Sequence, residues 1–250
     1  MKKKGEGRSL EDKIMQLIAE RLDTGGKLPT EQQMVKDFGV SRTTLRETLS
    51  MFEANGFIKS LRGSGRYATM PDFSGQIRDA WSVIIRANPY MMLELLEIRG
   101  LLEASTLPTA MERITIKQIE AMGRQVRAMK EKAARGEEYV EEDQLFHSIL
   151  YESTGNALLE QLLTAFSDLY NASHIDLPPS NLEGVAAQHE DMLEALTRRD
   201  LEAMTKLLKQ QFVDIRGRIL VYLMNAEQDG KKIDKTSWAD AKKTRKVRPA

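Results

Sequence analysis

The sequence lacks cysteine, has only three histidines and contains no long apolar run. Without cysteine, disulfide bonds, thiolate metal sites and cysteine nucleophiles are excluded. No stretch approaches the roughly 18 apolar residues of a membrane-spanning helix. The basic start at residues 1–12 is not followed by the apolar segment of a secretory signal. We therefore expect a cytoplasmic protein that has no membrane partner.

The 250 residues suffice for one or two domains, and their net charge of zero conceals an uneven distribution. Residues 1–70 hold 13 Lys or Arg and 9 Asp or Glu, which gives +4, whereas residues 71–230 hold 16 and 26, which gives −10. Residues 231–250 hold 8 and 2, which gives +6. A basic N-terminal part suggests binding to a polyanion, and chance unevenness is the alternative.

Residues 1–70 show three helical patterns followed by two short strands. Ser9 is placed to cap the first helix, Thr30 a second helix that ends at Gly39, and Ser41 a third that ends at Gly56. The segments "GFIKSL" and "RYATM" are typical of strands, and "RGSG" joins them as a glycine-rich turn. This order predicts a winged helix-turn-helix.

The rest of the chain is predicted to be helical. Residues 71–76 contain a proline and a glycine and are expected to form a linker. Helical patterns then cover residues 77–227, at about 76–87, 90–111, 115–134, 138–154, 157–173, 182–198 and 199–227. We predict a mainly α fold, with an all-α bundle of about six to seven helices after the winged helix. The polar, basic residues 228–250 are predicted to form a disordered tail.

The third helix carries the strongest functional signal. In a helix-turn-helix the second helix of the motif enters the major groove, with its N-terminal residues at the base edges. In this sequence Arg42, Thr43 and Arg46 share the exposed face of that helix. Arginine can contact guanine through two hydrogen bonds, which indicates DNA binding. The alternative is that Arg42 and Arg46 only pair with Glu47 or with solvent.

The turn between the two strands is the second candidate contact with DNA. Arg62 and Arg66 flank Gly63 and Gly65, and glycine lets a turn approach a backbone closely. An arginine at the tip can enter a minor groove. An ordinary solvated turn would have the same composition.

The segment "KLPTEQQMVKDFGVSRTTLRETLSMFEANGFIKSLRGSGRYA" resembles the DNA-binding domain of the GntR family of bacterial transcription regulators, over residues 10–69. The resemblance implies contacts with double-stranded DNA by Ser41, Arg42, Thr43, Thr44, Arg46, Gly63 and Gly65. Arg66 stands where the family commonly has threonine. The family usually has arginine at position 32, so Gln32 is expected to read a different base or to contribute less.

In the second half, Asp143 and His147 are four residues apart, which places them on one face of a helix. Such a pair can bind a metal, perform acid–base chemistry or form a simple polar pair. The segments "LLEIRGLLEASTLPTAMER", "EEDQLFHSILYESTGN", "QHEDMLEAL" and "RRDLEAMTKLLKQQF" resemble the ligand-sensing (FCD) domain of the FadR-type subfamily, over residues 77–227.

This second resemblance implies one divalent metal ion beneath a small carboxylate effector. Many members bind the metal through an aspartate and three histidines, and the matching residues are Asp143, His147 and His189. The third histidine position holds Gln211. We expect zinc, nickel or manganese, bound more weakly because an amide is a poorer ligand than imidazole. The alternative is that Gln211 donates its amide N–H to the effector carboxylate.

Two further residues are candidates for effector binding. Arg99 lies in an apolar helix and needs an anionic partner, which is Glu103, an acid of a neighbouring helix or the effector carboxylate. Related proteins use an arginine of this helix for the ligand. Asn156 fits a helix N-cap, with an effector contact as the other possibility. The remaining histidine, His174, is expected to be solvated or to cap a helix.

Together these features predict a homodimeric, effector-responsive repressor that binds a palindromic operator. Activation instead of repression is the first alternative. A metal-free sensor of the acyl-CoA type and a metal-dependent hydrolase are two more. We find no convincing nucleophile or general-base motif, so we do not expect an enzyme.

Overall fold

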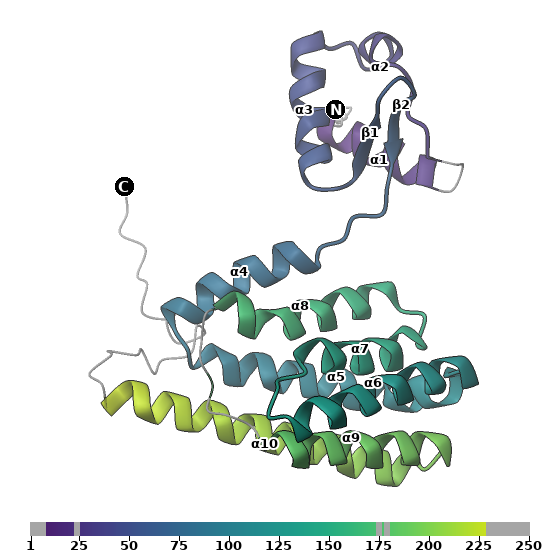
Figure 1. Cartoon of the computed structure of the whole chain (residues 1–250). Helices are drawn as coiled ribbons and strands as arrows, with labels where there is room; N and C mark the ends of the chain where they lie inside the picture. The colour runs from purple at the N-terminus through teal and green to yellow at the C-terminus, as the bar shows by residue number, and fades with distance from the viewer. Residues whose placement is uncertain (1–8, 23–25, 174–176, 178–180, 229–250) are drawn as a thin grey trace, which may run out of the picture. The chain divides into compact units, whose positions relative to one another are not determined.

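The computed structural model describes residues 9–22, 26–173, 177 and 181–228 (Figure 1). These residues form two compact units, which we call the head, up to Asp72, and the bundle, from Phe73. The predicted role of His174 and nearly all of the predicted tail, residues 229–250, lie outside the described residues.

The head contains three helices and a hairpin, namely α1 (Leu10–Leu22), α2 (Glu31–Phe38), α3 (Arg42–Ala54), β1 (Ile58–Leu61) and β2 (Gly65–Ala68). The predicted caps form, because the side chain of Thr30 accepts from the backbone N–H of Gln33 and that of Ser41 accepts from Thr44. The two strands are antiparallel, with Ile58 opposite Ala68. The predicted winged helix-turn-helix fold is confirmed.

One apolar cluster stabilises the head. Leu45, Leu49 and Phe52 of α3 are buried on the face opposite the exposed arginines. They pack with Ile14 of α1 and Met34 of α2. Because α3 buries one stripe, its other face, with Arg42 and Arg46, stays exposed.

The bundle consists of seven helices among the described residues, as predicted. They are α4 (Ser74–Ala87), α5 (Met91–Arg113), α6 (Ile116–Ala134), α7 (Val140–Glu152), α8 (Ala157–Ser173), α9 (Leu182–Thr197) and α10 (Leu201–Gln228). The first of them, α4, begins at Ser74, so residues 74–76 of the predicted linker are helical.

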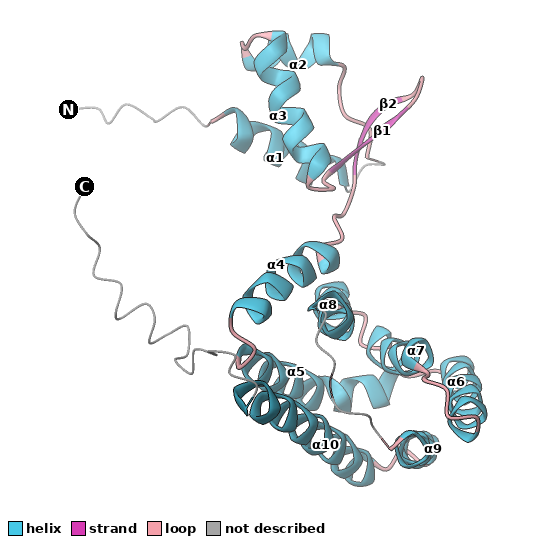
Figure 2. Cartoon of the chain, turned by 60° about the vertical axis from the view of Figure 1, so that its left-hand side comes forward, coloured by secondary structure: helices cyan, strands magenta, loops and turns pink. Residues whose placement is uncertain are grey.

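Helix α5 contacts α4, α7, α8 and α10, while α6 packs on α7 and α9 (Figure 2). Phe146 and Leu150 of α7 are fully buried, and so are Met92, Met122 and Met129. These methionines fill the core, as expected from their flexible side chains. None of the helices in the described ranges combines the length and apolar character that a membrane span requires.

Candidate functional site

Three helices of the bundle bring four polar side chains together. Asp143 and His147 lie one turn apart on α7, His189 comes from α9 and Gln211 from α10. The nearest possible ligand atoms of Asp143, His147 and His189 all lie within 4.8 Å of one another. His147, His189 and Gln211 are buried, while the Asp143 side chain keeps 37% of its exposure. The aspartate, both histidines and the glutamine therefore converge as the resemblance implied.

His189 is oriented by the backbone of its own helix. Its Nδ1 lies 2.8 Å from the carbonyl oxygen of Val185, which can only accept, so Nδ1 carries a proton. Its Nε2 lies 3.0 Å from Oδ1 of Asp143. Because Nδ1 already holds a proton, Nε2 either carries a second proton, which it donates to Asp143, or turns a lone pair toward the carboxylate oxygen. Two acceptors this close repel each other unless a proton or a metal ion lies between them.

The electrostatics of the cluster favour the metal-binding protonation states of Asp143 and His147, its two side chains on α7. Burial lowers the pKa of His147 to about 4, against the opposing effect of Asp143 and Glu103. Burial alone would raise the pKa of Asp143, but the hydrogen bond with His189 and nearby positive charge lower it to about 2. At neutral pH the imidazole is neutral and the carboxylate is ionised, which are the forms that bind metals.

Gln211 occupies the remaining side of the cluster. Its Nε2 lies 3.1 Å from Nε2 of His147 and 3.4 Å from Nε2 of His189. In this orientation the amide donates to an imidazole lone pair, and half a turn of the amide would present its oxygen instead. Nδ1 of His147 is buried and makes no hydrogen bond within the described part of the chain. The donor set therefore fits a divalent metal with an aspartate, two imidazoles and an amide.

The anionic partner of Arg99 is Glu103, one of the three predicted alternatives. Nε of Arg99 lies 2.5 Å from Oε1 of Glu103, and the two side chains keep only 10% and 1% of their exposure. The guanidinium also lies 5.8 Å from the ring centre of Phe212. Burial, and then the charge of Glu103, raises the pKa of Tyr151 well above its usual value. Arg99 and Glu103 thus form a buried charged pair in the surroundings of the Asp143, His147, His189 and Gln211 cluster.

A small cavity beside Arg99 has a volume of about 10 Å³ and is otherwise apolar, with Met92, Leu95, Leu96, Phe166 and Leu169 around it. This volume holds about one water molecule. Asn156 is exposed, and its side-chain oxygen accepts from the backbone N–H of Leu159, which is the N-cap role.

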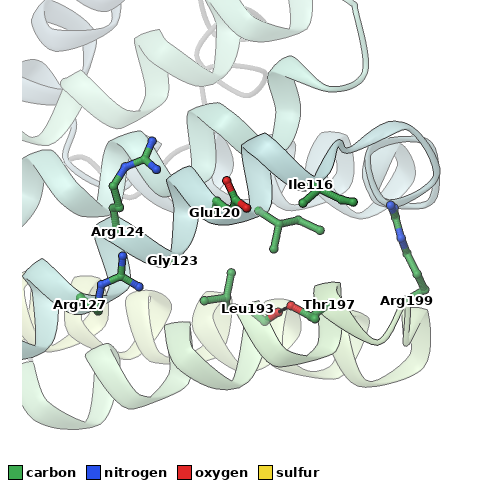
Figure 3. A pocket seen from close by; sticks show the side chains of 9 residues that line it. Ile116, Glu120, Gly123, Arg124, Arg127, Leu193, Thr197 and Arg199 are labelled. Atoms are coloured by element: carbon green, nitrogen blue, oxygen red, sulfur yellow. Dashed lines mark hydrogen bonds between the residues drawn. The ribbon is translucent and has the colours of Figure 1, made fainter.

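A larger groove of about 600 Å³ lies between α6 and α9 (Figure 3). Its lining includes Arg124, Arg127 and Arg199 but none of the four cluster residues. Arg199 is already engaged, because its guanidinium donates to the carbonyl oxygens of Met111 and Ile114. The groove is therefore separate from the cluster of Asp143, His147, His189 and Gln211.

In the head, Arg42, Thr43 and Arg46 are exposed on α3. Ser41 and Thr44 share a hydrogen bond of 2.8 Å between their hydroxyls at the start of this helix. Gln32 is exposed on the first turn of α2. The predicted DNA contacts on α2 and α3 thus lie within the first two turns of each helix, where side chains are accessible.

The partner of Arg46 is not Glu47, as one alternative had it, but Glu31. Nε of Arg46 donates to Oε2 of Glu31 over 2.7 Å, and Nη1 of Arg66 donates to the other oxygen over 2.7 Å. Reasoning from sequence missed Glu31, because the three residues are 15 and 35 positions apart. The only signal for this contact in the sequence was an acid, Glu31, at the first position of α2.

Gly63 in the hairpin turn and Gly65 at the start of β2 adopt φ angles of 76° and 108°, a region that favours glycine. Arg66 lies on β2, outside this turn, and its side chain is turned toward Glu31 with 24% of its exposure left. Arg62 is exposed in the turn itself.

Comparison with known families divides the chain in the same way. Residues 7–67 match the model of the bacterial regulatory proteins of the gntR family, and residues 94–213 match the FCD domain.

Among curated proteins, the chain is similar to the HTH-type transcriptional regulator LutR of Bacillus subtilis (strain 168), with 32% identity over 59% of this chain and 67% of LutR. It is 23% identical to the HTH-type transcriptional repressor NanR of Cronobacter sakazakii (strain ATCC BAA-894), over 80% of each chain. Among solved structures it resembles Streptococcus agalactiae GntR, with a TM-score of 0.59, 20% identity and coverage of 82% and 96%. That structural likeness concerns the fold.

Proposed function

The chain belongs to the GntR family of bacterial transcription regulators with an FCD domain, and on that basis we propose an effector-responsive, metal-containing repressor. Its head binds a palindromic operator as one half of a homodimer, because a two-fold dimer presents two recognition helices to two half-sites. Its bundle binds a divalent metal ion and a small organic acid. The name of the relative NanR, a repressor, supports repression.

The observation that carries the metal is the arrangement around His189. Its Nδ1 is engaged with a carbonyl, and its Nε2 points at a carboxylate oxygen and a second imidazole. Asp143, His147 and His189 would hold the ion, with Gln211 beside them. When bound, the metal supplies a positive charge that can attract a carboxylate.

The effector is proposed to be a small carboxylate. The metal charge, the amide of Gln211 and the guanidinium of Arg99 are the groups that would attract it. The cavity beside Arg99 has room for about one water molecule, so a long acyl chain would require the helices to separate. Even a small organic acid exceeds this volume, but it would displace far less of the packed core than an acyl-CoA effector would.

The proposal is tested on full-length protein stripped of metal with a chelator. We expect near-stoichiometric uptake of zinc, nickel or manganese, and a thermal shift with some small carboxylates only in the presence of metal. In a mobility shift, the responsive carboxylate should release a duplex that the protein selects from a random-sequence pool. Turnover of small esters by the zinc-loaded protein would instead favour the hydrolase alternative.

His147→Ala is the matched variant for this experiment. We expect it to lose metal uptake and the carboxylate response while keeping duplex binding, because His147 lies in the bundle and the predicted DNA contacts lie in the head. Unchanged metal uptake by this variant would remove the cluster from the proposal. Loss of duplex binding in a folded variant would contradict the division of roles.

A further inference from the structure

Glu31 connects three elements of the head through one carboxylate. It begins α2, Arg46 lies in α3 and Arg66 lies in β2. Oε2 accepts from Nε of Arg46 and Oε1 accepts from Nη1 of Arg66, each over 2.7 Å. Each oxygen therefore serves one arginine, and no single oxygen serves both.

The end of this network at Arg66 is partly buried. Arg66 keeps 24% of its side-chain exposure, and its Nε is buried, 4.0 Å from Oε2 of Glu53, without a hydrogen bond to any described residue. Glu31 itself starts a helix whose N-cap, Thr30, is engaged with the backbone. The hydrogen bond from Arg46, and then that from Arg66, lowers the pKa of Glu31, so the carboxylate stays charged at neutral pH.

The other end of the network is open to a ligand. Arg46 keeps 65% of its side-chain exposure, although its Nε is bound to Glu31. The guanidinium is planar, so a hydrogen bond at Nε fixes the direction in which the two terminal nitrogens point. Those nitrogens form a fork that matches O6 and N7 of guanine in the major groove.

We propose that Glu31 is a positioning residue that aims Arg46 and thereby sets the preference of the head for guanine at one operator position. The inference rests on the proposed operator binding. Without Glu31, Arg46 keeps its charge and can still contact phosphate, but its direction is no longer fixed. Glu31 therefore contributes to sequence preference more than to affinity for DNA in general.

Three substitutions in the full-length protein test this role. Glu31→Gln keeps the shape but leaves one acceptor oxygen for two arginines. Glu31→Asp keeps the charge but is one methylene too short to reach both. Glu47→Gln removes one acid from an exposed position of α3 and is the control for net charge.

The measurement is the ratio of affinities for a duplex selected from a random pool by the wild-type protein and for a random-sequence duplex. We expect Glu31→Gln and Glu31→Asp to lower this ratio by about tenfold, the order of one lost bidentate base contact. Glu47→Gln should leave it within about twofold. A new selection with Glu31→Gln should lose the requirement for guanine at one position per half-site.

An unchanged ratio for a folded Glu31→Gln or Glu31→Asp protein would overturn the assignment, and so would a reduction equal to that of the control. If Glu31→Gln does not fold, the result with Glu31→Asp decides. If the wild-type protein itself enriches no sequence, operator binding fails and this inference fails with it. A selective wild type with equally selective variants rejects only the role of Glu31.

Discussion

At the scale of single residues, Gln211 determines how many strong donors the proposed metal site has. Gln211 is 8% exposed, and its Nε2 lies 3.1 Å from Nε2 of His147, so its amide lies beside the proposed ligands. Amide oxygen is a weaker donor than imidazole nitrogen for zinc and nickel. We therefore expect Gln211 to limit the affinity of the proposed site for metal.

Gln211→His should tighten metal binding by at least about tenfold, because even outer-shell changes alter metal affinity by 10–100-fold. Competition between the metal-stripped protein and a fluorescent chelator measures this change. Gln210→His is the matched control, since residue 210 is exposed on the same helix and bonds to Asp214 instead. Equal affinities for both variants would show that residue 211 does not reach the metal.

At the scale of the element, α5 places a charged pair in the interior of the bundle. Arg99 and Glu103 are four residues apart, so helix geometry stacks them on one face. That face is buried against neighbouring helices, which makes each charge costly unless it is neutralised. Each charge of the pair thus needs the other when α5 is buried, and Arg99 is also a candidate contact for an effector.

Glu103→Gln should destabilise the bundle by about 3 kcal/mol, because it removes the negative charge beside a buried guanidinium. The double change Arg99→Met with Glu103→Leu should recover most of this loss. Hydrogen exchange of the α5 amides reports the opening free energy. Glu137→Gln, in the exposed pair with Arg135, should leave that exchange unchanged. Equal exchange in Glu103→Gln and the wild type would contradict the structural role of the pair.

At the scale of the whole molecule, the two sets of proposed functional side chains belong to different units. The polar cluster lies on α7, α9 and α10 of the bundle, whereas the predicted DNA contacts lie in the head. An effector bound to one unit changes DNA affinity only if it favours one of at least two arrangements of the chain. Stabilisation by metal and control of DNA binding are therefore expected to be separable.

Metal at 100 times its dissociation constant should stabilise the bundle by about 2.7 kcal/mol and leave the head unchanged. The reason is that every proposed ligand lies beyond Phe73. Hydrogen exchange measured separately for α3 and α7, with and without zinc, tests this expectation. Equal protection of both helices would show that the two units unfold together. His147→Ala should abolish the effect.

Sequence patterns predicted the local structure well because its causes lie within a few residues. Ser41 caps α3 through Thr44, three positions away, and Leu45 and Leu49 are buried one turn apart. The positions of the seven bundle helices follow the same apolar periodicity within a few residues. The spacing of Asp143 and His147 likewise placed them on one face of α7.

By itself, then, the sequence determined the helices, their caps, the hairpin and the side chains available for DNA and metal. Tertiary structure alone decided that Glu103 is the partner of Arg99, that Glu31 joins Arg46 to Arg66, and that Nε2 of His189 faces Asp143. The contacts of Glu31 and of His189 depend on how separate elements pack. The partner of Arg99 depends on which of several acids the packed bundle leaves beside its buried charge. The contacts of Glu31 and His189 join residues far apart in the sequence, so no local pattern records them, and the four-residue spacing of Arg99 and Glu103 offered Glu103 only as one of three partners.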